Sequence, residues 1–260
     1  MALSGGPLCR LSHTENMSQT ATSVPTPAPS NVFARFIGII TSPKATFQQV
    51  VAHPRWFGML VLTTLLITLC TAGPQFTESG RQAALDQQVR TMENFGMKIT
   101  DEVYSQMEAR SRFGGYITVV TMLIFAPVTV LIITVILWAI FNVAMGGDAT
   151  YKQALAVVVH AGVISTLAQL FTAPLNYARG TLGSATNLGV MLPMIDEKSF
   201  LGRLAGMVDL FMVWYVVVLA MGLAVLYRRR TQPIAIALFV VYAVIALGAA
   251  AIMSRFGGSN

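Results

Sequence analysis

Charged residues are scarce in this sequence. Asp, Glu, Lys and Arg make up only 11% of its 260 residues, whereas a soluble domain carries about 25%. Hydrophobic residues make up 55%, so the balance predicts a membrane protein rather than a water-soluble domain. The net charge of +6 is not arranged as a basic stripe interleaved with aromatic residues, and we therefore expect no nucleic acid partner.

Cysteine and the usual catalytic signatures are also missing. Cys9 lies near the N-terminus and Cys70 in an apolar run, so neither a disulfide framework nor a thiolate metal site can be read from them. The sequence contains no phosphate-binding Gly-Lys-Ser/Thr loop, no His-Glu-x-x-His motif and no Gly-x-Ser-x-Gly elbow. We therefore expect no enzyme: the sequence predicts no catalytic residues, no cofactor and no metal.

Long apolar runs are the dominant feature that is present. A bilayer core about 30 Å thick requires about 20 helical residues. Apart from Asp209, no Asp, Glu, Lys or Arg falls inside the runs, and Trp and Tyr residues lie near their ends, as in an aromatic belt. The prediction is an all-α, polytopic membrane protein with five transmembrane helices at about 57–73, 116–145, 154–173, 207–227 and 233–253.

The ends of the chain and its basic residues suggest an orientation. Residues 1–30 are rich in Ser, Thr, Pro and Ala, so we expect a disordered tail, within which Met17 offers a second candidate start. Arg228, Arg229 and Arg230 separate the last two spans and should stay in the cytoplasm. With five spans this places the N-terminus inside the cell and the C-terminal tail, residues 254–260, outside.

Two short amphipathic segments precede the first span. We predict helices at Val32–Ile40 and Pro43–His53, with Ser42 capping the second and Pro54 ending it. They either lie on the membrane surface near anionic lipid headgroups or pack against the helix bundle. For the first alternative, the membrane-surface candidates are Arg35, Phe36, Lys44, Phe47, Arg55 and Trp56.

Four polar residues lie inside or beside the spans: His160, Gln169, Asp209 and Asn142. An ionisable group in a membrane is a candidate functional residue. However, His160 has no acidic partner within a span, so it could instead be a neutral residue that hydrogen-bonds between helices. Asp209 lies near the end of a span, where a structural contact competes with an ion or substrate site.

The connections between spans have local signals of their own. In the turn "GGDATYKQ", Gly146 or Gly147 can end a helix in the left-handed conformation, and Thr150 with Gln153 forms a capping-box pattern for the next helix. The connection 74–115 has helical spacing, with Thr100 as a cap. It predicts an external helical hairpin, an extension of the second span, or a binding face. Small residues crowd the fifth span and permit close packing, either within the bundle or in a homo-oligomer.

These elements together resemble the bacterial branch of the Yip (Ypt-interacting protein) domain family. The resemblance rests on "FIGIITSPKATFQQVVAHPRW", on five spans, and on the segments "MGGDATYKQALAVVVHA" and "DLFMVWYVVVLAMGLAVLYRR". It covers residues 31–253 and implies a five-span protein of the bacterial inner membrane with a cytoplasmic N-terminus. Eukaryotic members are linked to Rab-type GTPases and vesicle traffic. The chain lacks the Asp-Leu-Tyr-Gly-Pro and Tyr-Gly motifs of those members, so the GTPase link is not carried over.

Two functions follow as hypotheses. The first is a non-enzymatic integral membrane protein that contacts the bilayer and scaffolds, organises or recruits a protein partner at the cytoplasmic surface. The alternative is a small-solute or ion transporter or channel, in which His160, Gln169, Asn142 and Asp209 line one internal path. Transport requires these polar groups to converge, so their positions in space discriminate between the two hypotheses.

Overall fold

The described part of the chain is helical, as predicted. The computed structural model describes residues 31–180, 185–192, 194–195 and 199–256. Within these residues, every regular element is a helix, and a single isolated bridge pairs Asn187 with Asp209. The predicted tail, residues 1–30 with Met17, and residues 257–260 lie outside the described residues.

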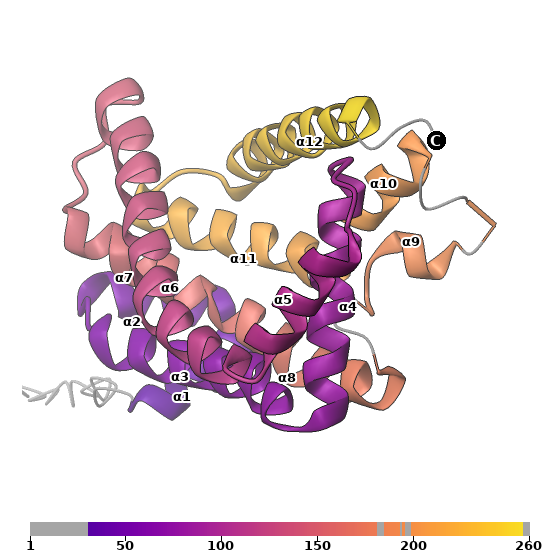
Figure 1. Ribbon diagram of the computed structural model, residues 1–260. Helices are drawn as coiled ribbons and strands as arrows, with labels where there is room; N and C mark the ends of the chain where they lie inside the picture. The colour runs from indigo at the N-terminus through magenta and orange to yellow at the C-terminus, as the bar shows by residue number, and fades with distance from the viewer. Residues whose placement is uncertain (1–30, 181–184, 193, 196–198, 257–260) are drawn as a thin grey trace, which may run out of the picture. The chain divides into compact units, whose positions relative to one another are not determined.

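Two short helices open the fold, with a break where the sequence places it (Figure 1). Helix α1 spans Val32–Thr41 and α2 spans Pro43–Ala52. Asn31 caps α1, because its side chain accepts a hydrogen bond from the Ala34 N–H at 2.7 Å. Ser42 occupies the N-cap position of α2, but its side chain makes no capping bond. The predicted break is therefore confirmed, and the predicted role of the Ser42 hydroxyl is wrong.

In the part of the chain that the structure describes, four helical segments are long and apolar enough to cross a membrane: Phe57–Phe76, Gly114–Ala144, Tyr151–Arg179 and Thr231–Arg255. Three of them change geometry along their length. The first is α3 (Phe57–Ala72) followed by the 3₁₀ turn η1 (Gly73–Phe76), the second is α6 (Gly114–Ala139) followed by the π turn η2 (Ile140–Ala144), and the third is α7 (Tyr151–Ala161) followed by α8 (Val163–Arg179). The fourth is a single helix, α12 (Thr231–Phe256).

The fourth predicted span is a shorter helix, α11, at Leu210–Leu226. Its 17 residues reach about 25 Å at 1.5 Å per residue, somewhat less than a hydrocarbon core of about 30 Å. It packs against α2, α7, α8 and α12, and much of its surface is covered by protein. The fold is thus a polytopic helical membrane protein with four long segments and a fifth, shorter apolar helix at the place of the predicted span.

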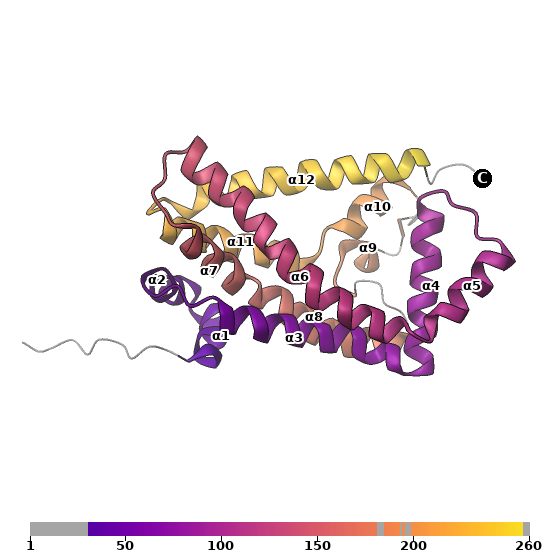
Figure 2. The same cartoon turned by 60° about the vertical axis from the view of Figure 1, so that its left-hand side comes forward.

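The connections between the long helices gather at two ends (Figure 2). One end holds α1, α2, the turn between η2 and α7, and the turn between α11 and α12. We call this end the platform and define it as residues 31–56, 145–152 and 227–230. Hydrogen bonds confirm the grouping. Arg229 Nη2 donates to the Met145 carbonyl at 3.1 Å, and Gln153 Nε2, in the residue that follows the 145–152 segment, donates to the Val51 carbonyl at 3.3 Å.

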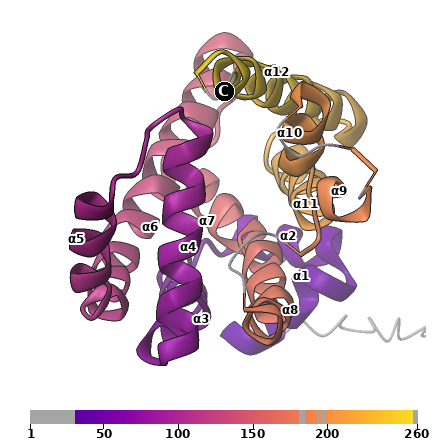
Figure 3. The same ribbon diagram turned by 45° about the vertical axis from the view of Figure 1, so that its right-hand side comes forward.

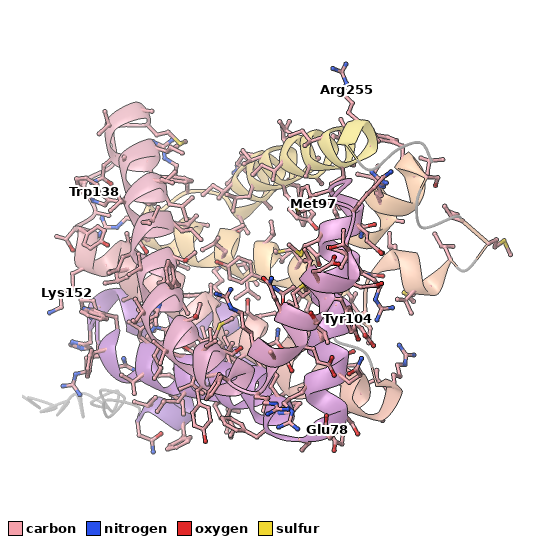
Figure 4. The ribbon with its side chains drawn as sticks, in the orientation of Figure 1. Glu78, Met97, Tyr104, Trp138, Lys152 and Arg255 are labelled. Atoms are coloured by element: carbon pink, nitrogen blue, oxygen red, sulfur yellow. The ribbon has the colours of Figure 1, made fainter. Side chains whose placement is uncertain are left out.

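The opposite end carries a helical hairpin formed by α4 (Glu78–Asn94) and α5 (Asp101–Ser111). Thr100 caps α5 by accepting from the Val103 N–H at 3.4 Å, as predicted. Gln82 Nε2 donates to the Tyr104 hydroxyl oxygen at 3.3 Å and so links the two helices, close to where Tyr104 is labelled in Figure 4. The predicted helical hairpin within 74–115 is therefore confirmed, and its external location stays a prediction.

Two further short helices lie at this end, one beside α12 and the other packed against the first (Figure 3). They are α9 (Leu188–Met191) and α10 (Phe200–Met207). A buried guanidinium, that of Arg203, donates to the Met253 carbonyl, and the Tyr242 hydroxyl donates to the Met207 carbonyl. These bonds attach α10 to the last helix.

Helices pack closely where α2 meets α7 and α11. Phe47 and Val157 are fully buried and flank Gly222, where a Cβ would lie 2.6 Å from Val157 Cγ1 and 2.9 Å from the Phe47 ring. By contrast, α6 and α12 carry long rows of exposed apolar side chains, which suit contact with lipid chains. The structure therefore has a protein-covered core near the platform and apolar helices around it.

Candidate functional site

The four intramembrane polar candidates separate into three places. Gln169 and Asp209 line the same pocket, which the other two do not reach. His160 is fully buried in the core on α7. Asn142 lies in the π turn η2, beside the platform. The structure therefore brings two of the four together.

The pocket has a volume of about 410 Å³ and lies between the end of α3, the length of α8 and the start of α11. Volumes of this size are typical of small-molecule sites, which are mostly apolar with a few placed polar groups. The described residues that line it are Cys70, Thr71, Pro74, Ser165, Ala168, Gln169, Thr172, Ala173, Asn176, Thr186, Asp209, Phe211 and Met212.

Asp209 has a structural role at the N-terminus of α11. Its Oδ1 accepts from the Phe211 N–H at 2.8 Å and from the Met212 N–H at 3.3 Å, so it caps the helix. Its Oδ2 accepts from the Thr186 hydroxyl at 2.5 Å. Both alternatives for Asp209 therefore remain, because the same carboxylate caps a helix and faces the pocket.

His160 is enclosed by protein. Its Nδ1 lies 2.7 Å from the Ala156 carbonyl one turn earlier, and its Nε2 is buried without a hydrogen-bond partner. Arg35 of α1 lies close enough for an electrostatic interaction. Among the described residues, no Asp or Glu is hydrogen-bonded or ion-paired to His160, so none forms a proton relay with it.

Asn142 holds a turn together. Its Nδ2 donates to the Ala149 carbonyl at 2.7 Å, and its Oδ1 accepts from the Tyr227 hydroxyl at 2.8 Å. Trp138 Nε1 donates to the same Ala149 carbonyl at 2.8 Å, and the ring of Phe141 stacks on that of Tyr227 at 4.9 Å. These contacts fasten the turn before α7 to the end of α11. Asn142 therefore acts as a structural residue.

The same turn contains the signals read from the sequence. Gly146 adopts a positive φ of 66°, and Thr150 and Gln153 form both hydrogen bonds of a capping box. Both predictions are confirmed. The π turn at Ile140–Ala144 and the break between α7 and α8 at Gly162 were not predicted.

The platform corrects part of the membrane-surface prediction. Phe47 is fully buried against α11, and Arg35 is 4% exposed. Neither side chain can contact lipid headgroups, because protein covers both. The apolar face of α2 packs against α7 and α11, which is the second of the two predicted alternatives. Burial lowers the pKa of Arg35 from its ordinary value, and the positive charge of Arg55 lowers it further.

The remaining surface candidates stay near or on the outside of the platform. Phe36 and Trp56 are half-buried and pack against the core, while Lys44 and Arg55 are exposed. Lys152 also projects outward, as Figure 4 shows. In addition, Phe33 and Ile37 expose 67% and 59% of their surface on one side of α1. A membrane-surface role for these residues remains a proposal.

Four polar residues on α8 were only partly recognised from the sequence. Ser165, Gln169, Thr172 and Asn176 all line the pocket, and their spacing of four, three and four residues places them on one helix face. That polar stripe inside an apolar span was a readable signal. Thr186 and Cys70 carried no comparable pattern.

The described residues form no metal-binding cluster. In the described part of the chain, no three His, Cys, Asp or Glu side chains come close enough to hold a metal ion. The pocket therefore offers hydrogen-bond acceptors, one carboxylate and apolar walls. Such a site can bind and orient a small group.

Comparison with known proteins gives two matches. The family model described as the Yip1 domain matches residues 37–253. The chain is also similar to the membrane protein YknW of Bacillus subtilis strain 168, with 26% identity over 261 residues that cover 94% of each chain. No solved structure matches the chain.

Proposed function

Because the chain belongs to the Yip1 domain family, we propose that it is a non-enzymatic, multi-pass protein of the cell membrane that recruits a protein partner to its platform. The observation that carries this proposal is the way α2 is held. It packs between α7 and α11, with Phe47 and Val50 fully buried. A segment fixed in this way presents its outer side as a preformed surface, which binds with less loss of conformational entropy than a mobile one.

The charge of the platform points to the cytoplasm and to an acidic partner. Its only acidic residue is Asp148. The opposite end mixes both signs, for example in the α4–α5 hairpin. Basic residues concentrate in cytoplasmic connections, which supports a cytoplasmic platform. The basic residues are Arg35, Lys44, Arg55, Lys152, Arg228, Arg229 and Arg230.

Transport is less well supported. A solute path needs its polar groups along one continuous route, whereas His160 and Asn142 lie away from the pocket that holds Gln169 and Asp209. Asn142 is occupied by the hydrogen bonds of a turn. The positions of the four residues therefore favour recruitment over transport.

Site-specific photocrosslinking in native membranes tests the proposal. A photoreactive residue is placed at Gln48, which is exposed on α2, and at Glu108, which is exposed on α5 at the other end. We expect a discrete crosslinked protein from position 48 and none of the same mass from position 108.

Charge reversal supplies the matched control. Lys44→Glu combined with Lys152→Glu should weaken the crosslink at position 48, because both exposed ammonium groups would repel an acidic partner. Lys98→Glu, at the opposite end, should leave it unchanged. Equal crosslinking at both ends, or none at position 48, would overturn the proposal.

A further inference from the structure

The pocket between α3, α8 and α11 is rich in hydrogen-bond acceptors. Thr172 donates its hydroxyl hydrogen to the Ala168 carbonyl, and Thr186 donates its own to Asp209. The Thr172 hydroxyl oxygen therefore keeps lone pairs that can accept a hydrogen bond. Asn176 lines the pocket, and its Oδ1 is buried without a hydrogen-bond partner. A buried acceptor left without a partner is destabilising, so a donor that enters the pocket and bonds to Asn176 Oδ1 would remove that destabilisation.

The pocket has a negative charge and an aromatic wall. Asp209 is the one ionisable acid among its described lining residues, and none of these residues is Lys, Arg or His. Phe211 lies beside Asp209, and an aromatic face attracts a cation. Pro74, Ala173 and Met212 add apolar surface. Among these described residues an anion would meet no positive side chain, whereas a cation would meet a carboxylate, an amide oxygen and a ring.

We propose that this pocket binds the primary ammonium group of an amphipathic molecule. The ammonium would donate to Asn176 Oδ1 and lie close to the Asp209 carboxylate, whose two oxygens can each accept more than one bond. The attached apolar part would lie against Phe211 and Met212. This site is at the end away from the platform, so it is independent of partner recruitment there.

Two sources can supply this chemistry. The pocket lies at the end of α3 and the start of α11, and we infer from these helix ends that it is near the lipid headgroups. Phosphatidylethanolamine carries a primary ammonium at that depth. A free long-chain amine carries the same group without a phosphate. A choline lipid carries a quaternary ammonium, which has no N–H and cannot donate to Asn176.

The test measures the thermal unfolding of the full chain in a neutral detergent. The probes are phosphatidylethanolamine, phosphatidylcholine and dodecylamine, and native mass spectrometry counts the bound molecules. We expect phosphatidylethanolamine to raise the unfolding temperature and to be retained about fivefold more than phosphatidylcholine, since one hydrogen bond distinguishes them. Stabilisation by dodecylamine alone would identify a free amine as the source.

Two variants locate the effect. Asn176→Leu removes the acceptor, and Asp209→Asn removes the charge while keeping a good helix cap. Each should abolish the preference for the primary ammonium. Asp148→Asn, an exposed carboxylate of the platform, is the matched control and should keep it. Equal binding of all probes, or a preference that survives Asn176→Leu, would overturn the proposal and would leave the pocket to water or unspecific lipid.

Discussion

A single residue, Arg228, carries backbone strain at the platform. Its φ is 51°, and it is the one described non-glycine residue with a positive φ. It follows α11, and the next N–H, that of Arg229, donates back to the Ala224 carbonyl at 2.9 Å. Glycine normally occupies this position after a helix. An arginine here has a conformational cost, which suggests that its charge is used.

Replacing Arg228 by glycine tests the conformational cost of its positive φ. Left-handed backbone costs an L-residue about 1–2 kcal/mol, and the extra freedom of an unfolded glycine costs about 0.5–1 kcal/mol. Arg228→Gly should therefore raise the free energy of unfolding by about 0.5–1 kcal/mol, measured by denaturant titration in detergent. Arg230→Gly, which has no such φ, should lower it. A loss of stability in Arg228→Gly would contradict the expectation.

Tyr227 and Asn142 form a second residue-scale pair. In Tyr227→Phe the Asn142 Oδ1 loses its donor, while the stacking on Phe141 is kept. We expect a loss of about 1–2 kcal/mol in the free energy of unfolding, the usual cost of leaving a buried acceptor unpaired. Tyr116→Phe is the control, since that side chain is 64% exposed and its loss should be near zero. Equal effects would mean that the hydrogen bond does not hold the turn.

At the scale of elements, the contact between α2 and α11 depends on Gly222, whose lack of a side chain lets Phe47 of α2 pack closely against α11. Gly222→Ala places a Cβ within 2.6 Å of Val157 and 2.9 Å of Phe47, both fully buried. Overpacking costs about 1–3 kcal/mol, more than the roughly 1 kcal/mol that alanine gains in a helix. We expect Gly222→Ala to lower the free energy of unfolding and to loosen α2, measured by hydrogen exchange.

Two controls separate packing from helix propensity. Gly248→Ala in α12 meets nothing within 4 Å and should be neutral or stabilising by up to about 1 kcal/mol. Adding Phe47→Leu to Gly222→Ala should recover part of the loss, because neighbouring substitutions are not additive. No recovery would place the clash elsewhere.

Local signals were readable from the sequence, and long-range partners were not. The break at Ser42, the capping box at Thr150 and the cap at Thr100 depend on neighbouring residues, so the pattern predicts them. The burial of Phe47 depends on α11, some 170 residues later along the chain, and an amphipathic face does not say what covers it. The same holds for the pocket, since Gln169 and Asp209 meet only after the spans assemble. The polar stripe ending at Asn176 was the one local hint.

For the whole molecule, the five apolar helical segments place their connections alternately at the two ends, the platform and the opposite end (Figure 2). With the platform in the cytoplasm, cysteines introduced at Arg90 or Ala185 should react with an impermeant reagent from outside, and one at Arg230 should not. The native Cys9 and Cys70 are first replaced. Labelling of position 230 alone would reverse the proposed orientation, and labelling of all three would contradict the alternation.

The position of α2 has a consequence for how the protein is made. The first described helices, residues 31–52, bury Phe47 against a helix that begins at Leu210. At about 5–20 residues per second, a ribosome needs on the order of ten seconds to travel that distance. During that interval the newly made α2 has an apolar face with no partner. A nascent chain interrupted before Leu210 would therefore keep this face open to chaperones and proteases, and completion of α11 would be the event that closes the fold.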